Sequence, residues 1–201
     1  MTLDDFIAAV NANLFLGEFS FAENQFNPRP GKEVEFADHV VWLHDDVIIF
    51  QLKQRDEPTE SPEIEEKWFR NKVLRKATKQ IRGTLDYLAK HDRITLTNQR
   101  GHDIHVRKSA IGRLSKVIVY LSGDALPDDR LRMRSYTSST AGLIHLIPLH
   151  DSLGMCRVLV TPADIADYLE FRELTLSKWN DSPISEQALT GQQPSPCHIS
   201  G

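Results

Sequence analysis

The sequence predicts an α/β domain in which helices cover both faces of a central β-sheet. Two short apolar runs, VVWL at residues 40–43 and VIIF at residues 47–50, are rich in the residue types that strands prefer. Apolar and polar residues do not alternate in either run, so both faces of these strands are expected to be buried. Segments of helical periodicity before and after the runs supply the covering helices, which favours a layered α/β architecture.

The N-terminal segment is predicted to be helical. Thr2 is a candidate N-cap, and apolar residues follow it at helical spacing. This helix is expected to end near Leu16, or to continue through Gly17 to about Glu23. Two prolines and a glycine then predict a loop over residues 27–32.

Two strands and one long helix form the predicted centre of the domain. The strands are expected over residues 35–43 and 47–53, and the helix over residues 62–90. Glutamates in the first turn of the helix favour its dipole. Apolar residues at helical spacing form one face of the helix. Basic side chains populate another face: Lys72, Arg75, Lys76, Lys79 and Arg82.

The second half of the chain continues the alternation of strands and helices. A hairpin with Gly101 in its turn is predicted over residues 94–108, followed by strands near residues 116–122, 142–151 and 155–161. Thr161 is the expected N-cap of a last helix. Residues 1–179 are interpreted as a single domain, and residues 180–201, rich in Ser, Pro and Gly, as a polar tail.

The composition limits the classes of function. The net charge of −4 means that nucleic-acid binding would require a local basic patch. Two cysteines are too few for a disulfide framework, which makes a reducing cytoplasm the expected location. No secretory signal and no apolar run long enough to cross a membrane is found, so no membrane partner is expected.

Polar side chains stand at the open end of the predicted hairpin. Successive strand residues face opposite sides of a sheet, so the loop length decides which side chains meet. If residues 44–45 form a two-residue loop, Asp38 pairs with Gln51, and Lys53 lies two residues further on the same face. The sequence therefore allows Asp38, Gln51 and Lys53 to converge at one end of the sheet.

This combination of groups suits metal-dependent chemistry. The carboxylate of Asp38, the amide oxygen of Gln51 and a main-chain carbonyl near position 52 are hard ligands suited to Mg²⁺ or Mn²⁺. An ammonium group such as that of Lys53 can orient an attacking water or stabilise negative charge. Together these groups suit hydrolysis of a phosphodiester by metal-activated water.

The segments "FAD", ending at Asp38, and "IIFQLK", ending at Lys53, resemble the signature of the PD-(D/E)xK nuclease superfamily. Ala37 stands where the signature has proline, and Gln51 stands where it has an acid. The Q-x-K form is similar to the Mrr-like branch of restriction endonucleases, in which glutamine at this position is compatible with activity.

The resemblance implies a restriction-endonuclease-like α-β-β-β-α-β core within a mixed sheet, with the helix at residues 62–90 following the hairpin. It also implies a further metal ligand from a glutamate near the first helix or at the entry to the strand. Glu18 and Glu33 are equal candidates for that ligand, and Glu23 ranks behind them.

The resemblance makes nucleic acid, DNA rather than RNA, the expected partner, and the basic face of the long helix its contact surface. Two alternatives stay open. Because Gln51 removes a charge from the metal site, the domain could be an inactive nuclease-like fold that binds nucleic acid or a protein partner. The hairpin could also be an ordinary buried hairpin with polar ends, and the basic helix face merely solvated.

Overall fold

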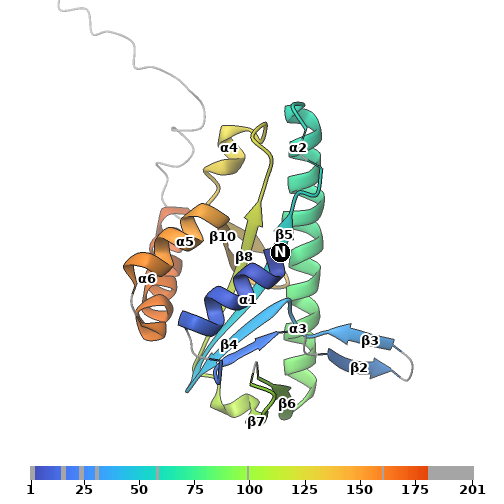
Figure 1. Ribbon diagram of the computed structural model, residues 1–201, viewed down its shortest axis with the longest axis vertical. Helices are drawn as coiled ribbons and strands as arrows, with labels where there is room; N and C mark the ends of the chain where they lie inside the picture. Colours follow the sequence, from blue (N-terminus) through green and yellow to red (C-terminus); the bar gives the residue numbers. More distant parts are fainter. Residues whose placement is uncertain are drawn as a thin grey trace, which may run out of the picture.

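The computed structural model describes residues 3–14, 17–22, 25–29, 32–57, 59–98, 100–159 and 161–180. Groups of strands and groups of helices follow one another along the chain (Figure 1). In chain order the elements are α1 (Leu3–Leu14), β1 (Ser20–Ala22), β2 (Gln25–Arg29), β3 (Lys32–Glu35), β4 (His39–Leu43), β5 (Asp46–Gln54), α2 (Pro62–Trp68), η1 (Phe69–Ala77), α3 (Thr78–Lys90), β6 (Arg93–Thr97), β7 (Asp103–Arg107), η2 (Lys108–Ala110), β8 (Arg113–Leu121), α4 (Asp128–Leu131), β9 (Ser135–Ser138), β10 (Gly142–Pro148), α5 (Leu149–Val158) and α6 (Pro162–Asn180).

The centre of the fold is a mixed six-stranded sheet with the strand order β1-β4-β5-β8-β10-β9. Strands β1, β4 and β5 are antiparallel neighbours, whereas β5, β8 and β10 run parallel. Strand β9 closes the other edge as an antiparallel partner of β10. The prediction of an α/β domain with a central mixed sheet flanked by helices is confirmed.

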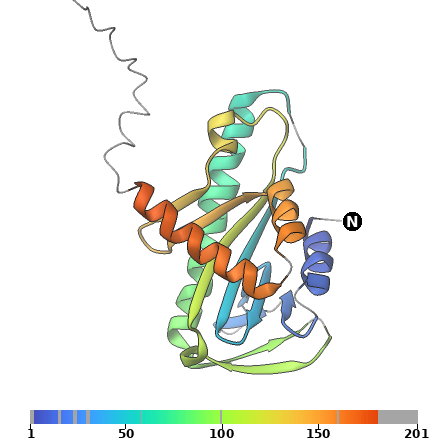
Figure 2. The same ribbon diagram turned by 90° about the vertical axis from the view of Figure 1, so that its left-hand side faces the viewer.

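Helices cover both faces of this sheet (Figure 2). The continuous run of α2, η1 and α3 packs on one face, where Phe69 and Ile81 meet Ile118. Helices α1, α5 and α6 pack on the opposite face, where Leu3 and Leu169 meet the side chains of β5 and β8. Since both faces are buried, the central strands carry the continuous apolar runs seen in the sequence.

The long helical run has the bounds that the sequence predicts, residues 62–90. Ser61 is its N-cap and accepts a hydrogen bond from the backbone N of Ile64, and Pro62 occupies the first turn. Its middle segment, η1, is a π-helix, which the sequence does not predict. Phe69 and Val73, both fully buried, anchor this segment on the sheet.

The prediction for the first sixty residues is wrong in three places. The first helix ends at Leu14, close to the shorter predicted end near Leu16, and strand β1 contradicts the longer alternative that runs to about Glu23. The expected loop over residues 27–32 is largely the hairpin of β2 and β3, because a two-stranded ribbon consists of edge strands, which tolerate the proline at position 28. The strand expected from residue 35 begins at His39.

The strand predicted over residues 155–161 is also wrong, because this stretch belongs mainly to helix α5. Leu149 and Met155 pack against the core at helical spacing, together with Cys156. Burial raises the pKa of the Cys156 thiol, so this residue stays a neutral, small apolar group. It belongs to helix α5 and not to a strand. Strand β9 is a further element that the sequence does not predict.

The predicted hairpin turn at Gly101 and the predicted cap at Thr161 are confirmed. The β6–β7 hairpin turns at Gly101, which has a positive φ of 79°. Helix α6 is capped by Thr161, whose hydroxyl accepts a hydrogen bond from the backbone N of Asp164. None of the helices in the described ranges is long and apolar enough to cross a membrane. Asn180, predicted to begin the tail, is the last residue of α6. The predicted N-cap at Thr2 and the rest of the predicted tail, residues 181–201, lie outside the described residues.

Candidate functional site

The turn of the β4–β5 hairpin sets the register on which the candidate site depends. Leu43 pairs with Asp46, so the loop consists of the two residues between them, as predicted. His44 adopts a positive φ of 57°, the left-handed conformation that tight two-residue hairpin turns require. Continuing this register to the open end of the hairpin brings Asp38 opposite Gln51.

Asp38 lies just before β4 and binds the last part of β5. Its Oδ2 atom accepts a hydrogen bond of 2.6 Å from the backbone N of Leu52 and one of 2.9 Å from Nζ of Lys53. The side chains of Asp38 and Lys53 are each only 11% exposed. This ion pair is thus shielded from solvent screening, unlike a pair at the surface.

The ammonium group of Lys53 lies among three oxygen atoms. Nζ is 2.9 Å from Oδ2 of Asp38, 2.6 Å from the carbonyl oxygen of Leu52 and 3.4 Å from Oε1 of Gln51. These are the carboxylate, carbonyl and amide oxygens that the sequence indicates as metal ligands. The end of the hairpin therefore forms an oxygen cradle, defined by these three atoms, that already holds one positive charge.

Gln51 is the most deeply buried side chain of the cluster, with an exposed fraction of 1%. With its oxygen directed inward, the amide places a second acceptor beside the carboxylate of Asp38, and Nζ of Lys53 at 3.4 Å is its donor. If the amide is turned, its nitrogen donates to both carboxylate oxygens of Asp38 at 3.2 Å and to Oε1 of Gln80 at 3.1 Å. The turned orientation satisfies both ends of the amide, and only the other orientation adds the oxygen of Gln51 to those around Lys53.

His39, the neighbour of Asp38 in the chain, adds no charge to the cluster. Its ring is buried against Phe50, and burial lowers its pKa from 6.5 to about 4. Its Nε2 atom has no hydrogen-bond partner among the described residues. A neutral imidazole at this position leaves Lys53 as the positive charge nearest to Asp38 in this part of the site.

The donor set fits a hard cation with few protein ligands. Within the described ranges, no three His, Cys, Asp or Glu side chains gather in a way that could hold a metal ion. The oxygen cradle instead offers one carboxylate, one amide oxygen and one carbonyl oxygen, a mixture that Mg²⁺ accepts when water completes its shell. A metal ion in the oxygen cradle would therefore be held by two neutral oxygens and only one carboxylate.

The structure does not bring Glu18 to this cluster. Its carboxylate forms an ion pair of 2.6 Å with Arg100, and its carbonyl accepts a hydrogen bond from Asn98, so it is held by the β6–β7 hairpin. Glu33 lies in β3, outside the six-stranded sheet, and its side chain is not among the described groups. Glu23, which follows β1, lies outside the described residues.

The five predicted basic residues of the long helix are all exposed, but they do not form one surface. Arg75, Lys79 and Arg82 line a groove between the helix and strand β9, and Lys72 and Lys76 do not line it. This groove lies on the flank of the helix away from the oxygen cradle. Helix α3 separates the two, since Gln80, next to Lys79, faces Gln51.

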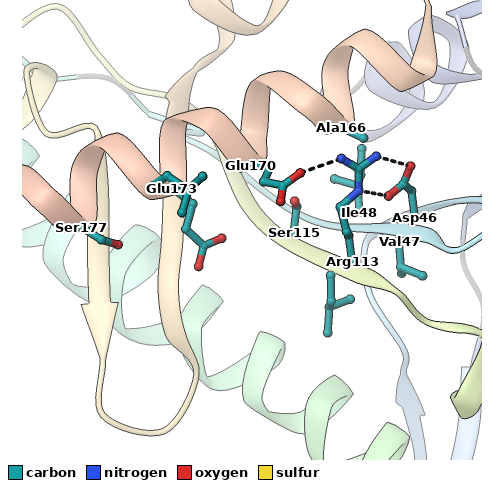
Figure 3. A pocket seen from close by; sticks show the side chains of 11 residues that line it. Asp46, Val47, Ile48, Arg113, Ser115, Ala166, Glu170, Glu173 and Ser177 are labelled. Carbon is teal, nitrogen blue, oxygen red and sulfur yellow. Dashed lines mark hydrogen bonds and ion pairs between the residues drawn. The ribbon is translucent and has the colours of Figure 1, made fainter.

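A second charged cluster, unpredicted from the sequence, lies at the other end of β5. The guanidinium of Arg113 binds Asp46 with two hydrogen bonds and contacts Asp167 and Glu170 of α6 at 2.7 Å each. Asp46, Arg113 and Glu170 border a pocket of about 340 Å³ beneath α6 (Figure 3). The guanidinium donates hydrogen bonds to Asp46, then to Asp167 and Glu170, and these raise the pKa of Arg113 above its usual value, so its charge is fully paired.

Sequence reasoning also missed Gln80, the partner of Gln51 on the long helix. A signal was present, because Gln80 and Thr84 stand at helical spacing next to the buried Ala77 and Ile81. Polar residues on a buried helix face indicate partners on the facing sheet. No such pattern in the sequence indicates the partners of Arg113, because they come from distant parts of the chain.

No family model matches the chain, and searches of the curated proteins and of the solved structures also give no match.

Proposed function

We propose that this protein is a metal-dependent nuclease that hydrolyses phosphodiester bonds of nucleic acid, DNA rather than RNA. The single observation that carries the proposal is the oxygen cradle at the end of the hairpin, where Oδ2 of Asp38 and the carbonyl oxygen of Leu52 lie 2.9 and 2.6 Å from the ammonium of Lys53. The amide of Gln51 adds a third oxygen at 3.4 Å when its oxygen is directed to Lys53. A cradle of this kind can exchange one cation for another while the backbone stays in place.

The residues of the cradle would have two roles, metal binding and stabilisation of negative charge. Asp38 supplies the charge, and Gln51 and the carbonyl of Leu52 supply neutral oxygens, so these three would hold Mg²⁺ or Mn²⁺. The metal would polarise the phosphate and lower the pKa of a bound water. Lys53, displaced from the centre of the cradle, stays within reach through its long side chain and offers its ammonium to the developing negative charge or to the attacking water.

The topology supports the finer description of the fold as a restriction-endonuclease-like core. Helix α1 precedes three antiparallel strands, β1, β4 and β5, and the long helix then leads to β8, which lies parallel to β5. This is the α-β-β-β-α-β order that the resemblance implies. The β2–β3 and β6–β7 hairpins are then insertions outside the six-stranded sheet.

A second candidate function is a nuclease-like domain that binds nucleic acid, or a protein partner, without cleaving it. The observation in its favour is that Lys53 already neutralises Asp38, the carboxylate of the cradle, within a site that is nearly closed to solvent. If the ammonium never leaves, the cluster is a buried ion pair that fixes the end of the hairpin.

Cleavage assays separate the two candidates. Plasmid and oligonucleotide substrates are incubated with the purified protein in Mg²⁺, Mn²⁺ or a chelator. We expect metal-dependent cleavage, and a loss of about 10²–10³-fold in rate for Lys53→Ala, the typical effect of removing a group that stabilises transition-state charge. Equal rates for the wild type and Lys53→Ala after matched purification would rule out catalysis at this site.

A further inference from the structure

A cationic groove lies between the long helix and the edge strand β9. Its volume is about 420 Å³, and one wall is formed by residues of η1 and α3 while Tyr136 of β9 and Thr140 form the other. Four basic side chains line the groove: Arg70, Arg75, Lys79 and Arg82. Arg70 was not among the residues expected to bind nucleic acid, and it enters only because the fold places it here.

The positive charge of the groove has almost no acidic side chain to compensate it. No acidic side chain of the described ranges lines it. Arg82 contacts Asp86 at 3.8 Å, but both side chains are more than half exposed, so this pair neutralises little. Arg70, Arg75 and Lys79 form no ion pair with any described residue. Free cations that share one groove mark a site for an anion.

The spacing of the charges fits an extended anion better than a single phosphate. Arg75 and Lys79 are four residues apart on the helix, which corresponds to a rise of roughly 6 Å. Arg70 and Arg82 extend the row in both directions along the same wall. A row of this kind follows a chain of phosphates, as the grooves of single-strand-binding proteins do.

The opposite wall supplies an aromatic ring. Tyr136 is partly buried and packs against the core beside Leu74, and both residues also line the groove. A ring held in this way offers a rigid face for stacking. Only an unstacked base can use such a face, because the bases of a duplex are already stacked on one another.

We infer that this groove binds single-stranded nucleic acid, with phosphates along the basic wall and a base on Tyr136. The statement that the bound strand is also the strand that is cleaved rests on the proposed function. The groove lies on the far flank of the long helix from Lys53, and β8 and β10 separate β5 from β9, a distance of roughly 14 Å at the usual strand spacing. It therefore anchors the strand some nucleotides away from the bond to be cut.

Binding is measured by fluorescence anisotropy of a labelled oligothymidylate of about 20 nucleotides, long enough to fill one site, in chelator so that no cleavage occurs. For the wild type we expect log Kd to rise with log salt with a slope of about 3, as four phosphate contacts on a single strand imply. Arg75→Ala/Lys79→Ala lowers that slope by about 1.4 and weakens binding.

A matched control comes from the same helix. Lys72→Ala/Lys76→Ala removes the same charge from exposed positions outside the groove, and we expect affinity within about twofold of the wild type. Tyr136→Ala weakens binding about 5- to 100-fold, and Tyr136→Phe, which keeps the ring, binds as the wild type does. Thermal melting of each variant confirms that it is folded.

Equal losses in the groove pair and the control pair would overturn the inference, because binding would then follow net charge. So would a wild-type affinity for duplex DNA or heparin equal to that for oligothymidylate, with Tyr136→Ala unchanged. A protein that binds the oligonucleotide through the groove but never cleaves contradicts the proposed function alone. A protein that cleaves while every groove variant binds normally contradicts the groove alone.

Discussion

Strand β5 carries a charged cluster at each end, and the two clusters balance their cations differently. At its start, Arg113 contacts three carboxylates and has a side chain that is 36% exposed. At its end, Lys53 contacts one carboxylate and two neutral oxygens, and its side chain is 11% exposed. The first cluster has an excess of negative charge around a fixed cation, and the second has a single compensated pair.

The difference separates a structural ion cluster from a candidate catalytic one. Arg113 cannot lose its proton and is bound from several directions, so it ties α6 to the sheet. Lys53 is a flexible ammonium in a preformed cradle of oxygens, a place that a divalent cation could take. The predictions below compare these two ends, from the largest expected effect to the smallest.

Replacing an aspartate by asparagine should lower activity at one end of the hairpin and leave it nearly unchanged at the other. We expect Asp38→Asn to lower metal-dependent cleavage about 10³-fold, because it removes the carboxylate of the oxygen cradle. Asp46→Asn should leave the rate within about threefold, since Asp46 contacts Arg113 and not the cradle. Initial rates on a plasmid substrate measure both, and a comparable loss in Asp46→Asn would contradict the division between the two ends.

The end that carries Asp38 should respond to pH through its neighbour His39. Burial lowers the pKa of His39 from 6.5 to about 4, so between these values the unfolded chain binds a proton that the folded chain does not. Stability present above pH 6.5 is therefore lost as the pH falls toward 4, by up to about 3 kcal/mol. His145 is shifted in the same way, to about 4, mainly by burial.

Urea unfolding of the wild type and of His39→Leu between pH 7 and 4 tests this shift. On acidification the free energy of unfolding of the variant should fall less than that of the wild type, by the contribution of His39. His145→Leu provides the corresponding control in β10. If His39→Leu showed the same pH dependence as the wild type, folding would not shift the pKa of His39.

The start of β5 should contribute to stability and not to cleavage. We expect Arg113→Met to lower the free energy of unfolding by about 1–2 kcal/mol, because the pairs are partly screened by solvent but three carboxylates lose their common partner. Urea unfolding measures the loss, and cleavage by the folded variant should be unchanged. A large drop in cleavage would link this cluster to the chemistry.

Gln51→Glu should give the oxygen cradle the second carboxylate that it lacks. Two acids beside one lysine repel each other, so we expect the metal-free variant to be about 1 kcal/mol less stable than the wild type. Mn²⁺ should recover this loss and bind about tenfold more tightly, as an added ligand charge implies. Thermal melts with and without Mn²⁺ decide, and an identical Mn²⁺ response in both proteins would place the metal elsewhere.

The hairpin shows what the sequence can predict. Once residues 44–45 form the loop, strand alternation alone places Asp38, Gln51 and Lys53 together, and the observed register agrees. The start of the long helix could also be predicted from the sequence, since Ser61 and Pro62 mark it. Local signals therefore suffice where neighbouring residues decide the geometry.

The errors arise where distant contacts decide. An apolar run such as that around Met155 suits a buried strand or a buried helix, and only packing against the sheet selects the helix α5. Glu18 was a reasonable ligand by position, but Arg100, far along the chain, binds it. Arg70 and Tyr136 share a groove because β9 lies beside the long helix, a neighbourhood that no spacing in the sequence reveals.

The central claim is that the oxygen cradle around Lys53 can exchange its ammonium for a divalent cation. Calorimetric titration of Mn²⁺ into the wild type, Lys53→Met and Asp38→Asn tests it most directly. We predict binding to the wild type, tighter binding to Lys53→Met, in which the competing charge is gone, and no binding to Asp38→Asn. Absence of Mn²⁺ binding to both the wild type and Lys53→Met would contradict the account, and the cluster would then be a buried ion pair.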